Sequence, residues 1–262
     1  MTRQFKKIIV FVIICIYIST LHAQNAAIIT DRPDQTESAA LVPVGYLQGE
    51  HGFAANFLAF NNEYSIASTL MRYGINEYFE LRLEIDPVFI DANKKVFGIN
   101  PISVGLKSKL IEKDKFALAL ITHVQLSKIA SKDFRSNYTA IATILTAAHS
   151  INEWWNIGYN AGIEWDGFAP SPYYVYTLTS GFAIGEHCGI FAEVYGNLYC
   201  SNPATDIISD PLDEHFVDFG FTYSPNHDLQ FDISCGSILQ TGAMDVFVST
   251  GFAYRFNTIK NK

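Results

Sequence analysis

Apolar and polar residues alternate one by one along several long stretches of this chain. Successive side chains of a β-strand point to opposite faces of its sheet, so a period of two predicts strands with one apolar and one polar face. A helix would mix the two kinds of residue around its circumference. The pattern is clearest where Phe79, Leu81, Leu83 and Ile85 alternate with Glu80, Arg82, Glu84 and Asp86, and again through residues 155–166 and 228–238.

The alternating stretches are long for the strands of a soluble protein. Strands of a β-sandwich usually have about five to six residues, whereas a tilted strand needs about 9–11 residues to cross a membrane. Hydrophobic residues make up 49% of the chain and aromatic residues 14%. We therefore predict an all-β fold, an antiparallel transmembrane β-barrel of about 12 strands. A soluble β-sandwich is the alternative.

The connections between the predicted strands alternate in length. Tight turns alternate with longer segments at residues 91–100, 128–136, 167–172 and 200–213, as expected for short periplasmic turns and long outer loops. The stretches 63–74 and 137–150 alternate only in part, so the direction of their side chains stays open. The predicted strands cover residues 44–58, 63–74, 77–90, 101–111, 115–127, 137–150, 153–166, 173–185, 188–199, 214–224, 228–238 and 244–256.

The chain begins like an exported protein. Basic residues precede the uncharged apolar run 8–18, and a small residue, Ala23, ends a cleavage signal. A membrane anchor is the alternative, but it needs roughly 20 apolar residues. We predict a signal peptide over residues 1–23, a periplasmic N-terminal segment over 24–43, an outer-membrane barrel over 44–256 and a periplasmic tail over 257–262. Both termini are then periplasmic.

The charge of the chain narrows its partners. The formal net charge is −8, which argues against binding to nucleic acid, because that requires a basic face. The partners we expect are outer-membrane lipid, the machinery that inserts barrels, and a small-molecule solute of unknown identity. The aromatic residue Phe256 at the end of the last strand resembles the terminal residue by which barrels are recognised for insertion.

Charged residues of the alternating strands are predicted to line the lumen. They form either a selective path for a solute or a salt-bridged interior that only keeps the barrel closed and hydrated. The predicted lumen-lining residues are Glu80, Arg82, Glu84, Asp86, Lys107, Lys109, Glu164, Asp166, Glu193, Asp232 and Arg255.

The sequence offers little for catalysis or metal binding. No G-x-S-x-G motif occurs, and Glu186, His187 and Cys188 form a tight cluster of metal-ligand types, within a predicted turn. Cys188 and Cys200 bracket one strand and should lie roughly 40 Å apart at about 3.3 Å per residue, too far for a disulfide. We predict no catalytic residue, no metal site and no cofactor.

The segment before the first strand carries a resemblance. Residues 30–38 read Thr-Asp-Arg-Pro-Asp-Gln-Thr-Glu-Ser, and residues 42–53 and 104–107 continue it. These residues resemble the outer-membrane transporter family named after the meta-pathway of phenol degradation. The resemblance implies a barrel that transports small molecules, aromatic or hydrophobic ones among them. It singles out the N-terminal motif residues Asp31, Arg32, Pro33, Asp34, Thr36 and Glu37.

The N-terminal motif is too polar to cross lipid, where its backbone groups would lack partners. It should lie in the periplasm or fold into the mouth of the barrel, either as an ordinary leader or as a fixed plug. The predicted function is passive passage of small molecules across the outer membrane. The alternatives are a closed structural or surface-binding barrel without transport and, third, a membrane-embedded lipid-modifying enzyme.

Overall fold

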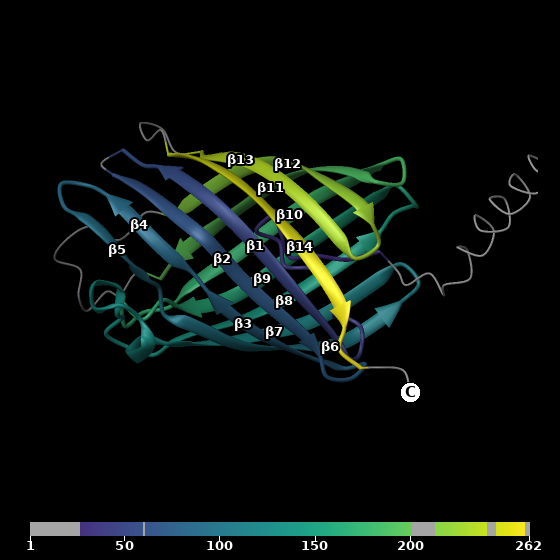
Figure 1. The fold of residues 1–262 in the computed structure, drawn as a ribbon, viewed down its shortest axis with the longest axis horizontal. Coiled ribbons are helices and arrows are strands. Elements are labelled where there is room, and N and C mark those ends of the chain that lie inside the picture. The colour runs from purple at the N-terminus through teal and green to yellow at the C-terminus, as the bar shows by residue number, and fades with distance from the viewer. Residues whose placement is uncertain (1–26, 60, 201–212, 240–244, 260–262) are drawn as a thin grey trace, which may run out of the picture.

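A computed structural model describes residues 27–59, 61–200, 213–239 and 245–259. The predicted signal peptide and the last three residues of the predicted tail lie outside these ranges. The described chain forms a closed antiparallel β-barrel of twelve wall strands (Figure 1), which confirms the predicted fold class. The strands are β1 (Tyr46–Phe57), β2 (Asn62–Gly74), β3 (Phe79–Ile85), β4 (Pro87–Asp91), β5 (Lys95–Ile99), β6 (Ile102–Lys113), β7 (Phe116–Leu126), β8 (Ala140–Ser150), β9 (Trp155–Trp165), β10 (Tyr173–Ile184), β11 (Cys188–Tyr199), β12 (Glu214–Asn226), β13 (Leu229–Ile238) and β14 (Val246–Asn257).

Two of the wall strands are interrupted. β3 and β4 both pair with β2, and Asp86 separates them. β5 pairs with β4 and is followed, after residues 100–101, by β6, which pairs with β3. The predicted outer loop 91–100 is therefore largely a hairpin arm that extends the wall. β1 pairs with β14 from Tyr46↔Asn257 to Phe57↔Val246, and this pairing closes the barrel.

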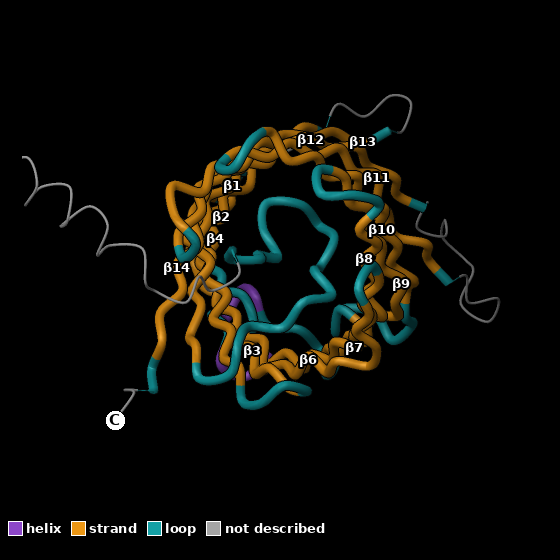
Figure 2. Tube along the Cα trace, turned by 90° about the vertical axis from the view of Figure 1, so that its right-hand side faces the viewer, coloured by secondary structure: helices purple, strands orange, loops and turns teal. Residues whose placement is uncertain are grey.

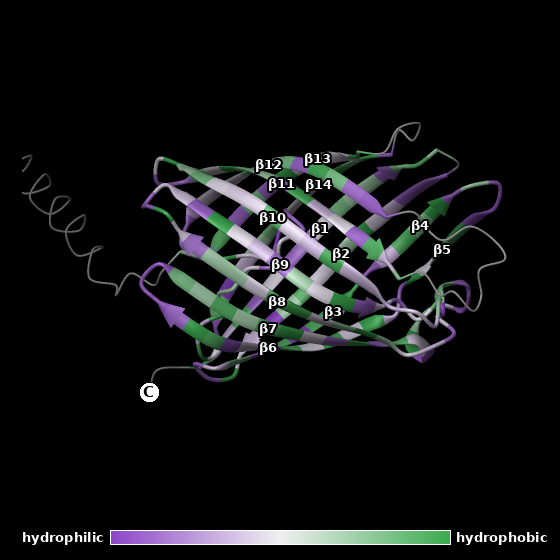
Figure 3. Cartoon of the chain, turned by 180° about the vertical axis from the view of Figure 1, so that it is seen from behind, coloured by the Kyte–Doolittle hydropathy of each residue, from purple (hydrophilic) through white to green (hydrophobic). Residues whose placement is uncertain are grey.

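The two faces of the wall differ as the alternation predicts. Figure 3 shows apolar and polar colours following one another along the strands. Leu81, Leu178 and Ile233 are about half exposed on that outer face, at 48%, 49% and 51%. The residues next to them in sequence, such as Arg82, Thr179 and Asp232, are buried toward the lumen. The outer face thus presents apolar side chains that no other part of the described chain covers.

A bulge explains why the stretch 63–74 alternates only in part. Gly52 of β1 pairs with Ser68 of β2, whereas the next residue, Phe53, pairs with Ile66. Ala67 is left over between them and has a positive φ of 61°. One extra residue reverses the facing of everything after it. Arg72 consequently points into the lumen, although counting in steps of two from Tyr64 on the outer face would place it outside.

One loop folds into the mouth at the long-loop end of the barrel. It contains the 3-10 helices η1 (Ser127–Ile129) and η2 (Lys132–Phe134). Phe134 and Ala130 pack against Val88 in a small apolar core, and Ser131 exchanges hydrogen bonds with Ile99 of β5 at 2.9 and 3.0 Å. The loop is therefore fixed to the wall and narrows this mouth.

The chain that precedes β1 runs inside the barrel. Figure 2 looks along the barrel and shows this segment as a loop within the ring of strands. None of the described helices is long and apolar enough to span a membrane. The short connections 75–78, 114–115, 151–154, 185–187 and 227–228 lie at one end of the barrel, which we call the short-turn end. The other end is the long-loop end.

Candidate functional site

Residues 27–45, which we call the plug, occupy the lumen. The plug leaves the lumen at the short-turn end, where Val44 forms a parallel bridge to Gly74 and Gly45 has a φ of 76°. The side chain of Ile259 lies against Gly45 from the far end of the chain, so a Cβ there would collide with it. Glycine at position 45 thus allows both the sharp turn into β1 and the contact with the chain end.

Asp31 is the centre of the plug's attachment to the wall. Its carboxylate Oδ2 lies 2.5 Å from Nη1 of Arg82, 3.1 Å from Nζ of Lys107 and 3.3 Å from Nη1 of Arg72. The three cations belong to β3, β6 and β2, and all are at most 4% exposed. Burial of a charge is costly without a partner, so these cations and Asp31 depend on each other.

Further carboxylates complete this buried network. Glu37 of the plug accepts two hydrogen bonds from Nη2 of Arg82, at 2.7 and 3.0 Å. Glu80 and Glu50 on the wall each form an ion pair with Arg72, at 2.8 and 2.9 Å. The same two carboxylates also accept plug backbone N–H groups, Glu80 from residue 42 and Glu50 from residues 31 and 32. The wall therefore binds the plug through both its charges and its backbone.

The opposite wall holds the plug through fewer charges. Arg32 donates to Asp232 of β13 and to Ser249 of β14, each at 3.0 Å. Glu193 of β11 accepts the backbone N–H of Gln35 at 2.7 Å and the hydroxyl of Thr36. The motif residues thus reach strands on every side of the lumen.

An acidic region lies where Asp34 approaches β11 and β12. Glu193 and Asp218 are direct cross-strand partners, and Asp218 is fully buried, with no hydrogen-bond partner for either carboxylate oxygen among the described residues. The charges that act most strongly on Asp34 are those same two carboxylates. Carboxyl groups this close cannot all be ionised without a large cost in free energy. The protonated form of at least one of them is therefore favoured on this side of the plug.

Two aspartates of the same motif therefore lie in opposite electrostatic environments. Burial would raise the pKa of Asp31, but Arg72, Lys107 and Arg82 outweigh it and hold that pKa well below its usual range. Burial, together with Glu193 and Asp218, raises the pKa of Asp34 well above its usual range. Asp31 is accordingly held as a carboxylate, and Asp34 favours its protonated form.

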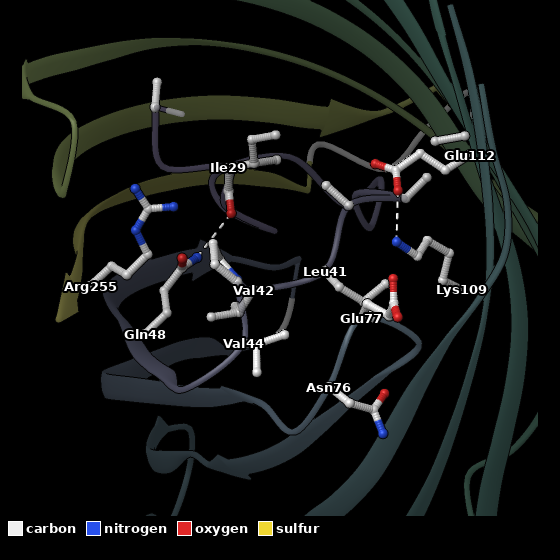
Figure 4. A pocket seen from close by; sticks show the side chains of 15 residues that line it. Ile29, Leu41, Val42, Val44, Gln48, Asn76, Glu77, Lys109, Glu112 and Arg255 are labelled. Carbon is white, nitrogen blue, oxygen red and sulfur yellow. Dashed lines mark hydrogen bonds and ion pairs between the residues drawn. The ribbon is translucent and has the colours of Figure 1, made fainter. Parts of the chain in front are cut away.

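The plug divides the lumen into separate cavities. At the short-turn end a cavity of about 320 Å³ lies between Ala39–Val44 of the plug, Gln48, Lys109 and Arg255. Figure 4 shows it from close by, with the hydrogen bond from Gln48 to the carbonyl of Ile29 at 2.9 Å and the ion pair between Lys109 and Glu112 at 2.7 Å. A second cavity of about 390 Å³ opens at the long-loop end, above Gln35 and Glu37.

The structure brings most of the predicted lumen residues to the inner wall but distributes them among three regions. Glu80, Arg82 and Lys107 bind the plug, and Glu193 and Asp232 do so from the other side. Glu84 and Glu164 line the long-loop cavity. Lys109 and Arg255 lie at the short-turn end, where Arg255 also pairs with Asp228 at 2.9 Å.

Two predicted lumen residues take part in connections instead. Asp86 separates β3 from β4 and accepts a hydrogen bond from Asn100 at 2.9 Å. Asp166 follows β9 and accepts the backbone N–H of Phe168 at 2.8 Å. Of the motif residues, Asp31, Pro33 and Thr36 are buried, and Arg32, Asp34 and Glu37 are half-buried.

Arg72 is the main residue that the sequence reasoning missed. It is fully buried and joins Asp31, Glu50 and Glu80. Its strand alternates irregularly because of the bulge at Ala67, so its facing could not be determined. The sequence did contain one indication: Arg72 lies in a strand between two strands that carry inward-facing glutamates, Glu50 and Glu80.

The remaining chemistry is sparse. Within the described ranges no three His, Cys, Asp or Glu side chains are arranged to hold a metal ion. Cys188, Cys200 and Cys235 are free thiols. His187 hydrogen-bonds through Nδ1 with the carbonyl of Ser224 at 2.8 Å. His51 lies on the outer face, 2.9 Å from the hydroxyl of Thr69 and with its ring 5.0 Å from that of Phe252.

Comparisons with known proteins agree with this architecture. A family model described as "Putative MetA-pathway of phenol degradation" matches residues 30–256. The barrel is similar to the COG4313 outer membrane channel from Pseudomonas putida F1, with a TM-score of 0.68 and 11% identity over 87% of this chain and 100% of that one. It is also similar to the KdgM porin, with a TM-score of 0.56 and 9% identity over 79% and 99%, and to the NanC porin, with 0.54 and 10% over 78% and 98%. No curated protein matches the chain in sequence.

Proposed function

Because this chain belongs to the MetA-pathway of phenol degradation family, we propose that it is an outer-membrane channel for the passive passage of small molecules. The observation that carries the proposal is the lumen itself. Cavities of about 320 and 390 Å³ lie on the two sides of the plug, each open toward one end of the barrel. Residues of the plug line both cavities and lie between them.

Passage then requires the plug to shift or leave a narrow path beside it. The acidic region is the weaker side of its attachment, because Asp34 faces Glu193 and Asp218 rather than a cation. A cavity of about 430 Å³ lies along this side, between Arg32–Asp34 and strands β9 to β13. We expect solutes to pass between the plug and this wall.

Solute uptake by liposomes tests the proposal. The mature protein, refolded and reconstituted, should let a neutral sugar of low molecular mass into liposomes, so that they swell in an isotonic solution of that sugar. A large dextran, which cannot enter the barrel, should give no swelling and serves as the control. The proposal would be contradicted if liposomes that contain the correctly folded barrel did not swell with any small solute.

A closed structural barrel is the second candidate function. It is favoured by the buried ion pairs that Asp31 of the plug forms with Arg72 and Lys107 of the wall. Leaving a buried charge without its partner typically costs about 3–5 kcal/mol. This candidate predicts that neither swelling nor ion conduction occurs while the plug is docked. The two candidates are therefore distinguished by the same experiment.

The orientation we propose places the short-turn end and both termini in the periplasm. Short periplasmic turns and longer outer loops are the rule for such barrels. In a variant whose native cysteines are replaced, a cysteine at Asn93 in the β4–β5 turn should react with an impermeant thiol reagent on intact cells. A cysteine at Glu153, in a turn at the other end, should react only after the outer membrane is opened. The reverse labelling would contradict the orientation.

The outer face should tolerate apolar residues only. Leu178 lies in the middle of β10 and is 49% exposed on the outside of the wall. Leu178→Arg should lower the free energy of unfolding by about 2–4 kcal/mol if the side chain lies near the bilayer midplane. Leu178→Phe is the matched control and should cost little. Equal losses in unfolding titrations in lipid vesicles would show that this face does not contact hydrocarbon.

A further inference from the structure

The cavity at the long-loop end, which we call the vestibule, has a lining of one electrostatic sign. Its volume is about 390 Å³, and its floor is formed by Gln35 and Glu37 of the plug. Glu84 of β3 and Glu164 of β9 face it from two different parts of the wall and interact with each other electrostatically. Among the described residues that line it there is no lysine or arginine.

The lysines and arginines nearest to the vestibule are already engaged below its floor. Arg82 is held by Asp31 and by both carboxylate oxygens of Glu37, and Lys107 by Asp31. Within the described part of the chain, neither Glu84 nor Glu164 forms an ion pair with a lysine or an arginine. Arg82 acts on Glu84 from below the floor and offsets part of its charge. The vestibule therefore keeps a net negative charge between low-dielectric walls, which strengthens its potential.

An aromatic ring and a polar group without a partner face the same space. Tyr195 lines the vestibule, and its ring stacks on Phe216 with centroids 5.0 Å apart and planes 11° apart, so its orientation is fixed. Nε2 of His123 is buried and has no hydrogen-bond partner among the described residues. Asn160 and Asn197 add amide groups to the lining.

From this lining we infer that the vestibule binds small organic cations that carry an ammonium group beside an aromatic ring. The ammonium group would lie between Glu84 and Glu164 and supply the positive charge that this part of the wall lacks. The ring would pack against Tyr195, and a cation near that ring gains a further attraction to its face. The inference deepens the proposed function and rests on it, since the vestibule is the outer half of the proposed path.

Equilibrium binding to the refolded mature protein tests the inference. The probe is the phenethylammonium ion, titrated calorimetrically at low ionic strength. Phenethyl alcohol and phenylacetate have the same ring and replace the ammonium group by a neutral or a negative group. We expect saturable binding of phenethylammonium with a stoichiometry of one, and affinity for the other two lower by at least about tenfold, which corresponds to about 1.4 kcal/mol.

Matched variants locate the bound cation. Glu84→Gln and Glu164→Gln should each weaken phenethylammonium binding about tenfold or more, whereas Glu112→Gln, the same change at the other mouth, should not. Tyr195→Leu should weaken binding severalfold, and Tyr195→Phe, which keeps the ring, should not. The heat-dependent gel mobility of each variant shows whether its barrel has folded.

Binding and passage can fail independently of each other. Binding without swelling of liposomes would contradict passage and leave the vestibule site standing. Swelling without binding of phenethylammonium, or equal binding of the alcohol, would overturn the vestibule site and leave passage standing. Binding that Glu112→Gln weakens as much as Glu84→Gln would show general attraction to an acidic protein and would also overturn it.

Discussion

Asp31→Asn should detach the plug from the wall. The substitution removes the carboxylate that Arg72, Arg82 and Lys107 share. Arg72 and Arg82 keep other carboxylate partners, whereas the buried Lys107 keeps, among the described residues, only Glu37 at 3.9 Å. Removing one partner of a buried ion pair typically costs about 3–5 kcal/mol, and we expect a loss of that order in the free energy of plug docking. The measurement is the reactivity of a cysteine introduced in place of Ala39, which is 4% exposed in the docked plug.

Asp34→Asn is the matched control, with the opposite expected sign. The pKa of Asp34 is raised in the docked plug, so the docked state binds more protons than the free plug, and docking weakens as the pH rises above the ordinary value near 3.8. The variant should remove this loss and protect the introduced thiol better at pH 8. Asp31 acts in the other direction, because its contribution is present above pH 3.8 and is lost as the pH falls through its lowered pKa.

Cysteine reactivity at several pH values separates these expectations. In a background without the native cysteines, the rate of Ala39→Cys is divided by the rate of the same thiol in unfolded protein at the same pH, because the thiolate is the reactive form and its fraction rises with pH. The protection obtained in this way should be strong at pH 5 and weaker at pH 8. Asp34→Asn should flatten this dependence, and Asp31→Asn should give little protection at both values. Equal protection in the two asparagine variants would show that the plug is not held by the charges described here.

Deleting residues 27–41 should turn the barrel into an open, cation-preferring channel. The uncovered wall carries five carboxylates along the path, besides those of the vestibule, against the three cations Arg72, Arg82 and Lys107. The five are Glu50, Glu80, Glu193, Asp218 and Asp232. A negative potential confined between low-dielectric walls enriches cations, on the order of tenfold at low salt. The preference should fade between 0.1 M and 1 M salt, as the screening length falls from about 10 Å to about 3 Å. Reversal potentials in a salt gradient measure it.

Arg82→Ala refines the same measurement. It removes a positive charge from the lumen, so it should increase cation preference further in the deletion variant. In the full-length protein it should also loosen the plug, because Glu37 and Asp31 both pair with Arg82. If the deletion variant does not fold, the double variant Asp31→Asn, Glu37→Gln can be measured in its place, because it keeps the whole chain. Anion preference in the folded deletion variant would contradict the assignment of the lumen charges.

The strands could be predicted because lipid and lumen impose opposite requirements on neighbouring residues. β3 and β9 alternate throughout, and β13 alternates from Leu229 to Gly236, so both their location and their facing followed from sequence. β8 lies where a strand was predicted, but its facing stayed open because Ala140, Ala142 and Ile144 put apolar residues on the inner wall as well. Where both faces of a strand carry apolar residues, the sequence has no two-residue alternation of apolar and polar residues to detect.

The register of β2 and the partners of the plug could not be predicted, for a different reason. Ala67 has no property that distinguishes a bulge residue from any other alanine, and one inserted residue reversed the facing of Arg72. The charges of the 31–38 motif suggested a fixed contact. The wall residues that form ion pairs with these charges lie on β2, β3 and β6. These strands come together only in the folded barrel, and local sequence does not show which of their residues meet.

The contacts of the plug have a consequence for the order in which the barrel is assembled. Asp31 and Glu37 bind β2, β3 and β6, which are early in the chain, whereas Arg32 binds β13 and β14, which are last. The N-terminal segment therefore connects the first strands to the last hairpin, whose strand β14 must pair with β1 for closure. A segment held by the early strands reduces the loop-closure entropy that the final pairing must overcome. We expect the plug to act as an internal template that guides the last hairpin to the first strand.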